Sequence, residues 1–380
     1  MKKFTVIIFT LTVLLLVNCT NTPSEQETDF LTPFTKNLQV NPVLLPIAST
    51  GFYCPVRKDT VRWEEKDVFN PASVVKGDTL FLLYRAEDTI GKYNGTSRIG
   101  LAYTLDGYHL NRQDKPVLFP DNDQCFKYEW EGGCEDPRIV EDADGTYYMT
   151  YTAYDGDKAR LFIATSKDLR RWTKYGSVFQ KAGNEYVDMW SKSGSVICSE
   201  KNGKLVATMI NGEYWMYWGE SNIYMATSKN LVDWTPLLET DPDKMKLDTM
   251  RRYTKSFKIL FSTREGKFDS ELVEPGPPAI ITEPGILFIY NSKNSPLYGD
   301  GNLAPGAYAA GQIITDKNDP SKVINRLDKW FITPDQPFEI EGQVNNVCFV
   351  EGLAYFKGRW LLYYGTADSK IAVAESDWKR

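Results

Sequence analysis

The 380-residue sequence has one histidine and no block of basic residues, and each absence narrows its chemistry. Catalytic triads with a separate imidazole base and most metal centres are excluded, unless His109 alone serves them. His109 lies in the polar, turn-like stretch 106–109, so we expect it in a surface loop. With a net charge of −6, the chain also lacks the positive surface that binds nucleic-acid phosphates, and we expect no nucleic-acid partner.

Cysteine is scarce as well, and no two cysteines form a C-x-x-C pair, which argues against a zinc site. Beyond Cys19 there are five, an odd number that leaves at least one thiol unpaired in a monomer. We expect buried free thiols, with a Cys125–Cys134 disulfide as the alternative. We therefore expect any catalytic groups to be carboxylates, and we expect neither a metal ion nor another cofactor.

A long apolar run occurs at residues 4–17, directly after two lysines, and it is too short to span a bilayer stably. This pattern is typical of a signal peptide, here residues 1–18. Residues 16–19 resemble a bacterial lipoprotein cleavage box, in which Cys19 becomes the lipidated first residue; ordinary secretion is the alternative. We expect a flexible tether over 19–40 and a protein of the bacterial cell envelope that contacts the membrane only through its lipid anchor.

A short tag recurs five times along the rest of the chain, with consecutive spacings of 62, 62, 86 and 62 residues. The tags are Leu101–Thr104, Ile163–Ser166, Met225–Ser228, Gly311–Ile314 and Val373–Ser376. An apolar strand, a glycine-containing turn and a second apolar strand precede each tag, so each unit holds about four strands. The repeat therefore predicts an all-β, five-bladed β-propeller over residues 41–380.

Two further expectations complete this architecture. The extra residues of the longest spacing should lie near 244–268, as a rim loop or a short helix. The strand 61–68 should complete the last blade, because closing the ring removes exposed strand edges.

The second strand of each predicted hairpin ends in a polar cluster. These clusters are residues 84–88, 151–155, 210–213, 290–293 and 364–368. Because the inner strands of a propeller converge on a central channel, the clusters should face one shared pocket. A wet channel without function is the alternative.

The sharpest local signal is Gly-Gly-Cys-Glu-Asp-Pro-Arg-Ile at residues 132–139. Pro137 restricts the backbone beside two adjacent acids, and Arg138 can hold a carboxylate or a sugar hydroxyl; a plain turn is the alternative. Glu274 lies on a similarly rigid loop before a strand. The aromatic side chains of the segment 214–218 either stack on sugar rings or pack in the core.

Several motifs, in order along the chain, resemble glycoside hydrolase family 130. They are Phe69–Pro71, Tyr84–Ala86, Gly133–Arg138, Gly276–Pro278, Asp319–Val323 and Tyr363–Asp368. The likeness covers about residue 67 to the C-terminus. It implies a five-bladed propeller that acts on β-mannosides, in a family of mostly inverting phosphorylases with a smaller group of hydrolases.

The resemblance also implies residue roles. Asp136 would be the general acid, able to pass its proton through a hydroxyl of the bound mannose. The positions that look like sugar-binding groups are Asn70, Arg85, Arg138, Lys192 and Asp368. The chain departs from the pattern of the family's phosphorylases at three places. Asn291 stands where the phosphorylases carry a phosphate-binding histidine, and Asn211 to Glu213 stand where they carry an arginine near the end of the third hairpin. Glu274 stands where they usually carry a glycine. We expect Asn211 and Asn291 to contact substrate.

These replacements put neutral and acidic groups where a phosphate would need cations. Asp136 with Glu213 or Glu274 instead matches the acid and base of an inverting glycosidase. The sequence therefore predicts an inverting glycoside hydrolase that releases mannose from β-1,2-linked mannosides and takes mannose-containing oligosaccharides as substrate. A β-mannosyl-oligosaccharide phosphorylase and a noncatalytic glycan-binding lipoprotein are the alternatives.

Overall fold

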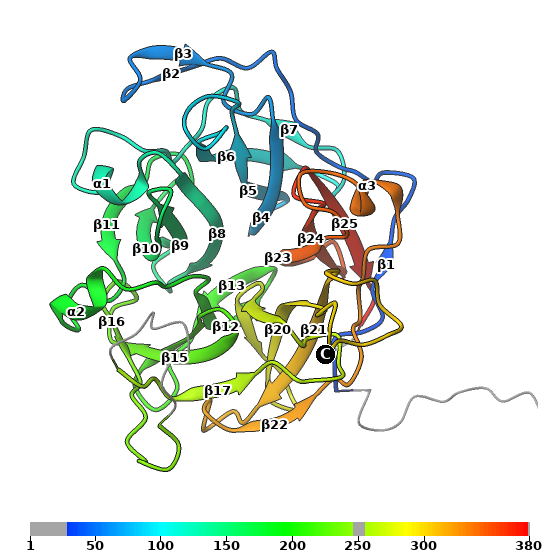
Figure 1. The fold of residues 1–380 in the computed structure, drawn as a ribbon. Coiled ribbons are helices and arrows are strands. Elements are labelled where there is room, and N and C mark those ends of the chain that lie inside the picture. The colour runs from blue at the N-terminus through cyan, green and yellow to red at the C-terminus, as the bar shows by residue number, and fades with distance from the viewer. Residues whose placement is uncertain (1–28, 246–254, 379–380) are drawn as a thin grey trace, which may run out of the picture.

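A computed structural model describes residues 29–245 and 255–378, and this part of the chain consists of β-strands joined by loops (Figure 1). Its three helices have four residues each: α1 (Phe126–Glu129), α2 (Asn184–Val187) and α3 (Pro337–Ile340). The all-β fold class is therefore confirmed. The predicted signal peptide and Cys19 lie outside the described residues.

Within the described residues, the antiparallel strand pairings form five groups and one separate hairpin. The groups follow one another along the chain, except that the first strand, β1, belongs to the last group. The hairpin is β2 (Phe52–Cys54) and β3 (Asp59–Val61). The first group is β4 (Asp67–Lys76), β5 (Thr79–Glu87), β6 (Ser97–Thr104) and β7 (Asn111–Arg112). The second is β8 (Gly133–Glu141), β9 (Tyr147–Tyr154), β10 (Ala159–Ser166) and β11 (Thr173–Ser177).

The remaining three groups follow the same plan. The third is β12 (Ser195–Lys201), with β13 (Lys204–Ala207), β14 (Tyr214–Trp218), β15 (Asn222–Ser228), β16 (Trp234–Pro236) and β17 (Ile259–Ser262). The fourth is β18 (Leu272–Pro275), β19 (Ala279–Ile281), β20 (Ile286–Lys293), β21 (Tyr308–Thr315) and β22 (Val323–Arg326). The fifth is β23 (Cys348–Phe356), β24 (Arg359–Thr366), β25 (Lys370–Ser376) and β1 (Thr35–Lys36).

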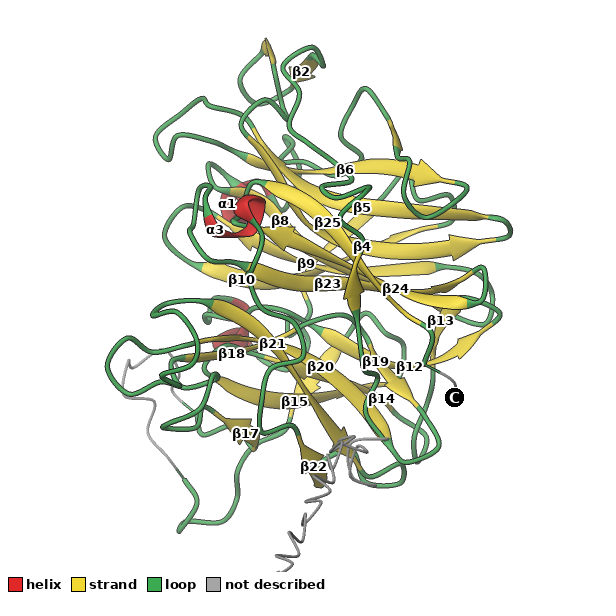
Figure 2. Ribbon diagram, turned by 90° about the vertical axis from the view of Figure 1, so that its right-hand side faces the viewer, coloured by secondary structure: helices red, strands yellow, loops and turns green. Residues whose placement is uncertain are grey.

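Figure 1 shows these groups arranged around a common centre, with β4, β8, β13 and β23 closest to it. Neighbouring inner strands touch: β4 packs against β8 and β23, and β12 runs parallel to β19. In the side view the strands run from one face of the ring to the other, and the helices lie on one of these faces (Figure 2). Polar side chains on the inner strands are thereby brought together in the middle.

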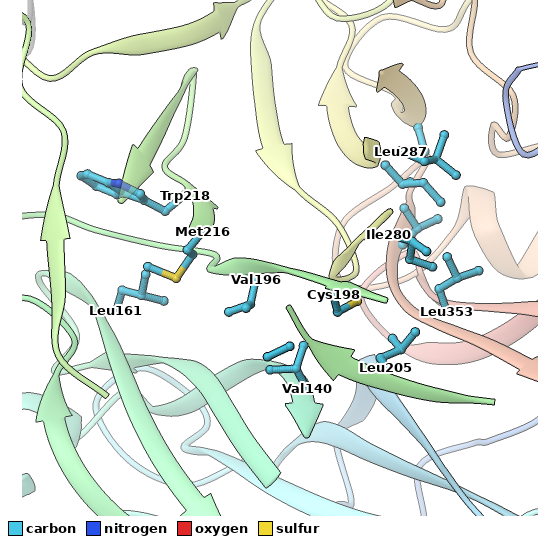
Figure 3. Packing of buried hydrophobic residues seen from close by; sticks show 14 of the residues in the cluster. Val140, Leu161, Val196, Cys198, Leu205, Met216, Trp218, Ile280, Leu287 and Leu353 are labelled. Atoms are coloured by element: carbon cyan, nitrogen blue, oxygen red, sulfur yellow. The ribbon is translucent and has the colours of Figure 1, made fainter. Parts of the chain in front are cut away.

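The hydrophobic core lies between neighbouring groups. Val140 of β8 and Leu161 of β10 pack in one buried cluster with Val196 of β12 and Met216 of β14 (Figure 3). Inner strands are covered on both faces; all nine residues of β8 are buried. Such strands are expected to be almost entirely apolar. The charged residues inside β8 are therefore exceptions that need an explanation.

Three inner strands carry a β-bulge at a comparable place. The strand register shifts at Phe69/Pro71 in β4, at Glu135/Arg138 in β8 and at Val350/Gly352 in β23. A bulge turns a side chain away from the regular alternation, and bulges are common beside active sites. The bulged residues include Asn70 and Asp136, whose φ angles of 46° and 49° lie in the left-handed region.

The predicted tether over 19–40 is wrong for its described part. Phe30 and Leu31 are buried, and the backbone of Leu31 exchanges two hydrogen bonds with the side chain of Gln312. These apolar residues add to the core, so the folded region begins well before residue 41. The low-complexity composition of the preceding stretch hid this boundary.

The predicted closure of the last blade by residues 61–68 is also wrong. β1 pairs with β25, and the Asn41 side chain donates to the Val373 carbonyl at 2.7 Å. Val61 instead ends the separate β2–β3 hairpin, while Asp67 begins β4. The closing strand therefore lies earlier in the chain than predicted.

The insertion expected at residues 244–268 contains a strand. β17 pairs with β15, so a rim loop or a short helix is the wrong description of residues 259–262. Residues 246–254 of this segment lie outside the described part.

The cysteines and His109 lie where the sequence predicts. All five cysteines in the described chain are buried and free, so the Cys125–Cys134 disulfide is not formed. His109 lies in a loop with its side chain 82% exposed, as predicted. No helix within 29–245 or 255–378 is long and apolar enough to cross a membrane.

Candidate active site

Asp136 occupies the bulge of β8 and is 3% exposed. Its Oδ1 accepts a hydrogen bond from Asn70 Nδ2 at 2.9 Å and lies 3.3 Å from Arg85 Nη1. Burial raises the pKa of Asp136, but the positive charges of Arg85 and Lys192 outweigh it, so this pKa lies below its ordinary value. Asn70 and Arg85 thus hold the Asp136 carboxylate in a defined orientation.

Arg85 joins Asp136 to two further carboxyl groups. Its Nη2 lies 2.7 Å from Glu87 Oε1 and 2.9 Å from Glu135 Oε1. Burial raises the pKa of Glu135 to about 7; Arg85 opposes the shift and Asp136 adds to it. Of the adjacent acids, Asp136 is therefore the stronger acid and Glu135 the weaker one.

Glu274 at the end of β18 is the centre of a second carboxyl cluster. It is buried, accepts a hydrogen bond from Ser193 Oγ, and its Oε1 lies 3.3 Å from Lys192 Nζ. Burial raises the pKa of Glu274, Lys192 opposes the shift, and Glu220 adds to it. Glu220, in the loop after β14, accepts a hydrogen bond from Trp190 Nε1 at 3.1 Å.

Lys192 connects the two clusters electrostatically. Burial lowers its pKa, but Glu274, Glu220, Asp136 and Glu135 together raise it above its ordinary value. Four carboxyl groups therefore act on one ammonium group. The site is rich in carboxyl groups: the pKa of Asp136 is lowered, whereas the pKa values of Glu135 and Glu274 are raised.

Glu213 does not belong to this site. Asn211 and Gly212 form the tip of the hairpin before β14, with φ angles of 53° and 79°. Glu213 is 37% exposed and pairs with Lys229 at 3.2 Å, while Asn211 donates to the carbonyl of Asn318. The predicted roles of Glu213 and Asn211 are therefore wrong.

The acid missing from the prediction is Glu220. Glu213 lies just before β14 and Glu220 lies two residues after its end, so the two acids belong to opposite ends of this strand. The signal was present in the sequence, because Glu220 follows Trp218 and Gly219 at the end of the second strand, where the other groups carry their polar clusters.

A sequence model of a family described as beta-1,4-mannooligosaccharide phosphorylase matches residues 39–380. The chain belongs to glycoside hydrolase family 130. The resemblance noted in the sequence is thereby confirmed, and the protein is a member of a family of carbohydrate-active enzymes that act on mannosides.

Individual family members and structures are similar over nearly the whole chain. A 1,2-beta-oligomannan phosphorylase from Thermoanaerobacter sp. strain X514 is 32% identical, over 90% of this chain and 97% of the relative. A glycosyl hydrolase structure from Bacteroides ovatus is 46% identical with a TM-score of 0.85, covering 91% and 94% of the two chains. A third structure, also 46% identical with a TM-score of 0.85 and covering 90% and 93%, comes from work reporting family 130 hydrolases that target β-1,2 mannosidic linkages in Candida mannan.

Two residues expected to bind sugar in this family 130 protein are used inside the protein instead. Arg138 is 2% exposed, and its donors reach the carbonyls of Asp136, Pro275 and Gly276 at 2.6–3.1 Å. Asn291 is fully buried and exchanges two hydrogen bonds with the backbone of Val350. The predicted contacts of both with substrate are therefore wrong, because their polar atoms are occupied and covered.

Asp368 and Tyr308 are two further polar residues of the site. Burial raises the pKa of Asp368 to about 7, with Arg85 opposing and Asp136 adding to the shift. Tyr308, at the start of β21, feels the charges of Glu274 and Asp368 and has a pKa raised above its ordinary value, chiefly by burial. The structure thus brings Asp368 together with the Asp136 cluster, and it adds a phenol that sequence reasoning missed.

The aromatic segment 214–218 belongs mainly to the core. Tyr217 and Trp218 have no exposed surface, while Tyr214 and Trp215 are half-buried at the start of β14. Core packing, rather than stacking on sugars, explains Tyr217 and Trp218.

Proposed function

We propose that this family 130 protein is an inverting glycosidase that releases mannose from β-1,2-linked mannosides, and that its five strand groups are the blades of a propeller. Asp136 is the general acid. Glu274 is the base that activates water, and Glu220 orients that water. Asn70, Arg85, Lys192 and Asp368 hold the sugar hydroxyls.

The observation that carries this proposal is the pairing of Glu274 with Glu220 around Lys192. A phosphate dianion at this place would meet two carboxyl groups and a lysine whose Nζ already lies 3.3 Å from Glu274 Oε1 and feels the negative charge of Glu220. Like charges in a poorly solvated cleft repel strongly. A neutral water, in contrast, is a good partner for two carboxyl oxygens.

The chemistry follows from this arrangement. Glu274 takes a proton from water, whose oxygen bonds to the anomeric carbon while the glycosidic bond breaks on the opposite face. A raised pKa suits Glu274 to this task, because a stronger base removes the proton more readily. Asp136 returns a proton to the leaving oxygen. Asp136 must first take up that proton from solvent in the substrate complex, where a bound sugar removes water and so raises the pKa of this carboxyl from its lowered value.

The second candidate is phosphorolysis, favoured by the 1,2-beta-oligomannan phosphorylase that shares 32% identity with this chain. The two functions differ in what they consume. We expect equal rates of β-1,2-mannobiose cleavage at zero and at saturating phosphate, since the Glu274 and Glu220 carboxyls disfavour the anion. A rate that depends on phosphate would favour the phosphorylase.

We also propose that Cys19 carries a lipid that tethers the enzyme to the cell envelope. The support is the apolar run 4–17 followed by the lipoprotein-like residues 16–19. When the full chain is expressed in a bacterium, mass spectrometry of the N-terminal peptide should find diacylglycerol on Cys19, and Cys19→Ala should move the protein from the membrane to the soluble fraction. An unmodified Cys19 in mature, active protein would contradict the anchor.

A further inference from the structure

A buried arginine links the strands that carry the two central acids. Arg138 donates from Nη1 to the carbonyl of Asp136 at 3.1 Å. Its Nε and Nη2 reach the carbonyls of Gly276 and Pro275 at 2.8 and 2.6 Å, directly after Glu274 in the chain. One rigid guanidinium thus spans the backbone beside Asp136 and the backbone beside Glu274.

The remaining partner of Arg138 comes from a third inner strand. Glu351 lies at the bulge of β23, has no exposed surface, and its Oε1 is 2.8 Å from Arg138 Nη2. Among the described residues, neither carboxyl oxygen of Glu351 makes a well-aligned hydrogen bond. The contact with Arg138 is therefore what compensates the burial of this polar group, which would otherwise be costly.

We propose that Glu351 is a positioning residue: it holds the Arg138 fork in place and thereby fixes the separation between Asp136 and Glu274. The role in turnover rests on the proposed function, since an inverting mechanism needs a defined gap between acid and base. We call this arrangement, in which Glu351 holds Arg138 and Arg138 binds the backbone beside both acids, the Arg138 clamp; its existence rests only on the contacts of Arg138. No strand pairing joins β8 directly to β18 in the described residues. The Arg138 side chain therefore provides a direct contact between β8, next to Asp136, and the backbone that follows Glu274.

The surroundings of Glu351 indicate that its shape matters more than its charge. Burial raises the pKa of Glu351 well above its ordinary value; Arg138 and Lys192 oppose this, while Asp136 and Glu274 add to it. A protonated Glu351 offers Arg138 a carbonyl oxygen, and a glutamine offers the same oxygen from the same distance. Alanine offers none and leaves a cavity beside a buried cation.

The test compares Glu351→Ala and Glu351→Gln with a matched control variant, Glu64→Ala. Glu64 is an equally buried carboxyl whose Oε2 lies 3.0 Å from Arg112 Nη1, outside the site. We expect Glu351→Ala to lower kcat on β-1,2-mannobiose by up to about 100-fold with KM little changed, since a misplaced group costs about that much. Glu351→Gln should restore most of the lost turnover. Glu64→Ala should lower Tm without lowering kcat.

Wild-type kcat in folded Glu351→Ala would overturn the proposal, as would a folded Glu351→Gln that is as impaired as the alanine variant. If Glu351→Ala does not fold, Arg138→Lys decides, because lysine cannot make the forked contacts: reduced kcat supports the clamp and wild-type kcat overturns it. If the wild-type protein cleaves no mannoside, the proposed function fails instead. Crystal structures of the wild type and the variant then test the clamp alone, and an unchanged Asp136–Glu274 separation would overturn it.

Discussion

Replacement of Asp136 by asparagine is expected to lower turnover by roughly 10²- to 10⁴-fold, the usual contribution of general acid catalysis. Asparagine keeps the shape of the side chain and can still contact Asn70 and Arg85, but it has no proton to give to the leaving oxygen. The fold should survive, because the bulge of β8 is held by backbone pairing with β9. The measurement is the initial rate of mannose release, with Tm recorded for each variant.

Asp144→Asn provides the matched control for this variant. Asp144 is exposed in the turn that joins β8 to β9, at the other end of β8 from Asp136, so the variant makes the same chemical change on the same hairpin outside the site. It should keep the wild-type rate. A folded Asp136→Asn enzyme with near-normal turnover would remove Asp136 from the mechanism.

Glu274→Gln and Glu220→Gln should each reduce turnover severely, by roughly 10²-fold or more, since each removes a carboxylate from the proposed water site. Glu213→Gln should behave as the wild type. Glu213 lies on the exposed hairpin tip with Lys229, about a strand's length from Glu220. The three variants make the same chemical change, one carboxylate oxygen replaced by an amide NH2 group, so their rates compare position rather than chemistry.

The contrast between these glutamates decides which end of β14 faces the substrate. Full activity in both Glu274→Gln and Glu220→Gln would refute the water site. A severe loss in Glu213→Gln alone would return that residue to the mechanism and contradict the geometry of the hairpin.

Much of the fold could be predicted because it repeats. The five recurring tags lie on β6, β10, β15, β21 and β25, the strand that follows the central hairpin of each group. Each unit contains the same local pattern, two apolar strands around a glycine-containing turn. A wrong prediction in one unit therefore leaves the predictions for the other units unchanged. Closure of the fifth group by β1 could not be predicted, because pairing between residues 35 and 375 depends on the finished ring and not on any local pattern.

The site was predictable where its residues sit in distinctive local sequence. Asp136 stands beside a proline in a bulge, Arg85 lies near the end of β5, and Asp368 lies in the turn after β24. The prediction for the third hairpin is wrong because Asn211-Gly212 is a turn between two strands and not the end of one. The strand that follows this turn leads to Glu220, seven residues after Glu213.

Glu351 illustrates what sequence cannot show. It lies within the mostly apolar strand 348–356, and nothing nearby distinguishes a structural acid from a functional one. Its importance comes from Arg138, more than two hundred residues away in the chain, at 2.8 Å in space.

The most direct test of hydrolysis with inversion is proton NMR of the first product formed from β-1,2-mannobiose in phosphate buffer. Water attacking opposite the leaving oxygen should give free α-mannose at early times, before mutarotation equilibrates the anomers. The same product should appear when phosphate is omitted. Initial β-mannose would contradict inversion, and accumulation of mannose 1-phosphate would contradict hydrolysis.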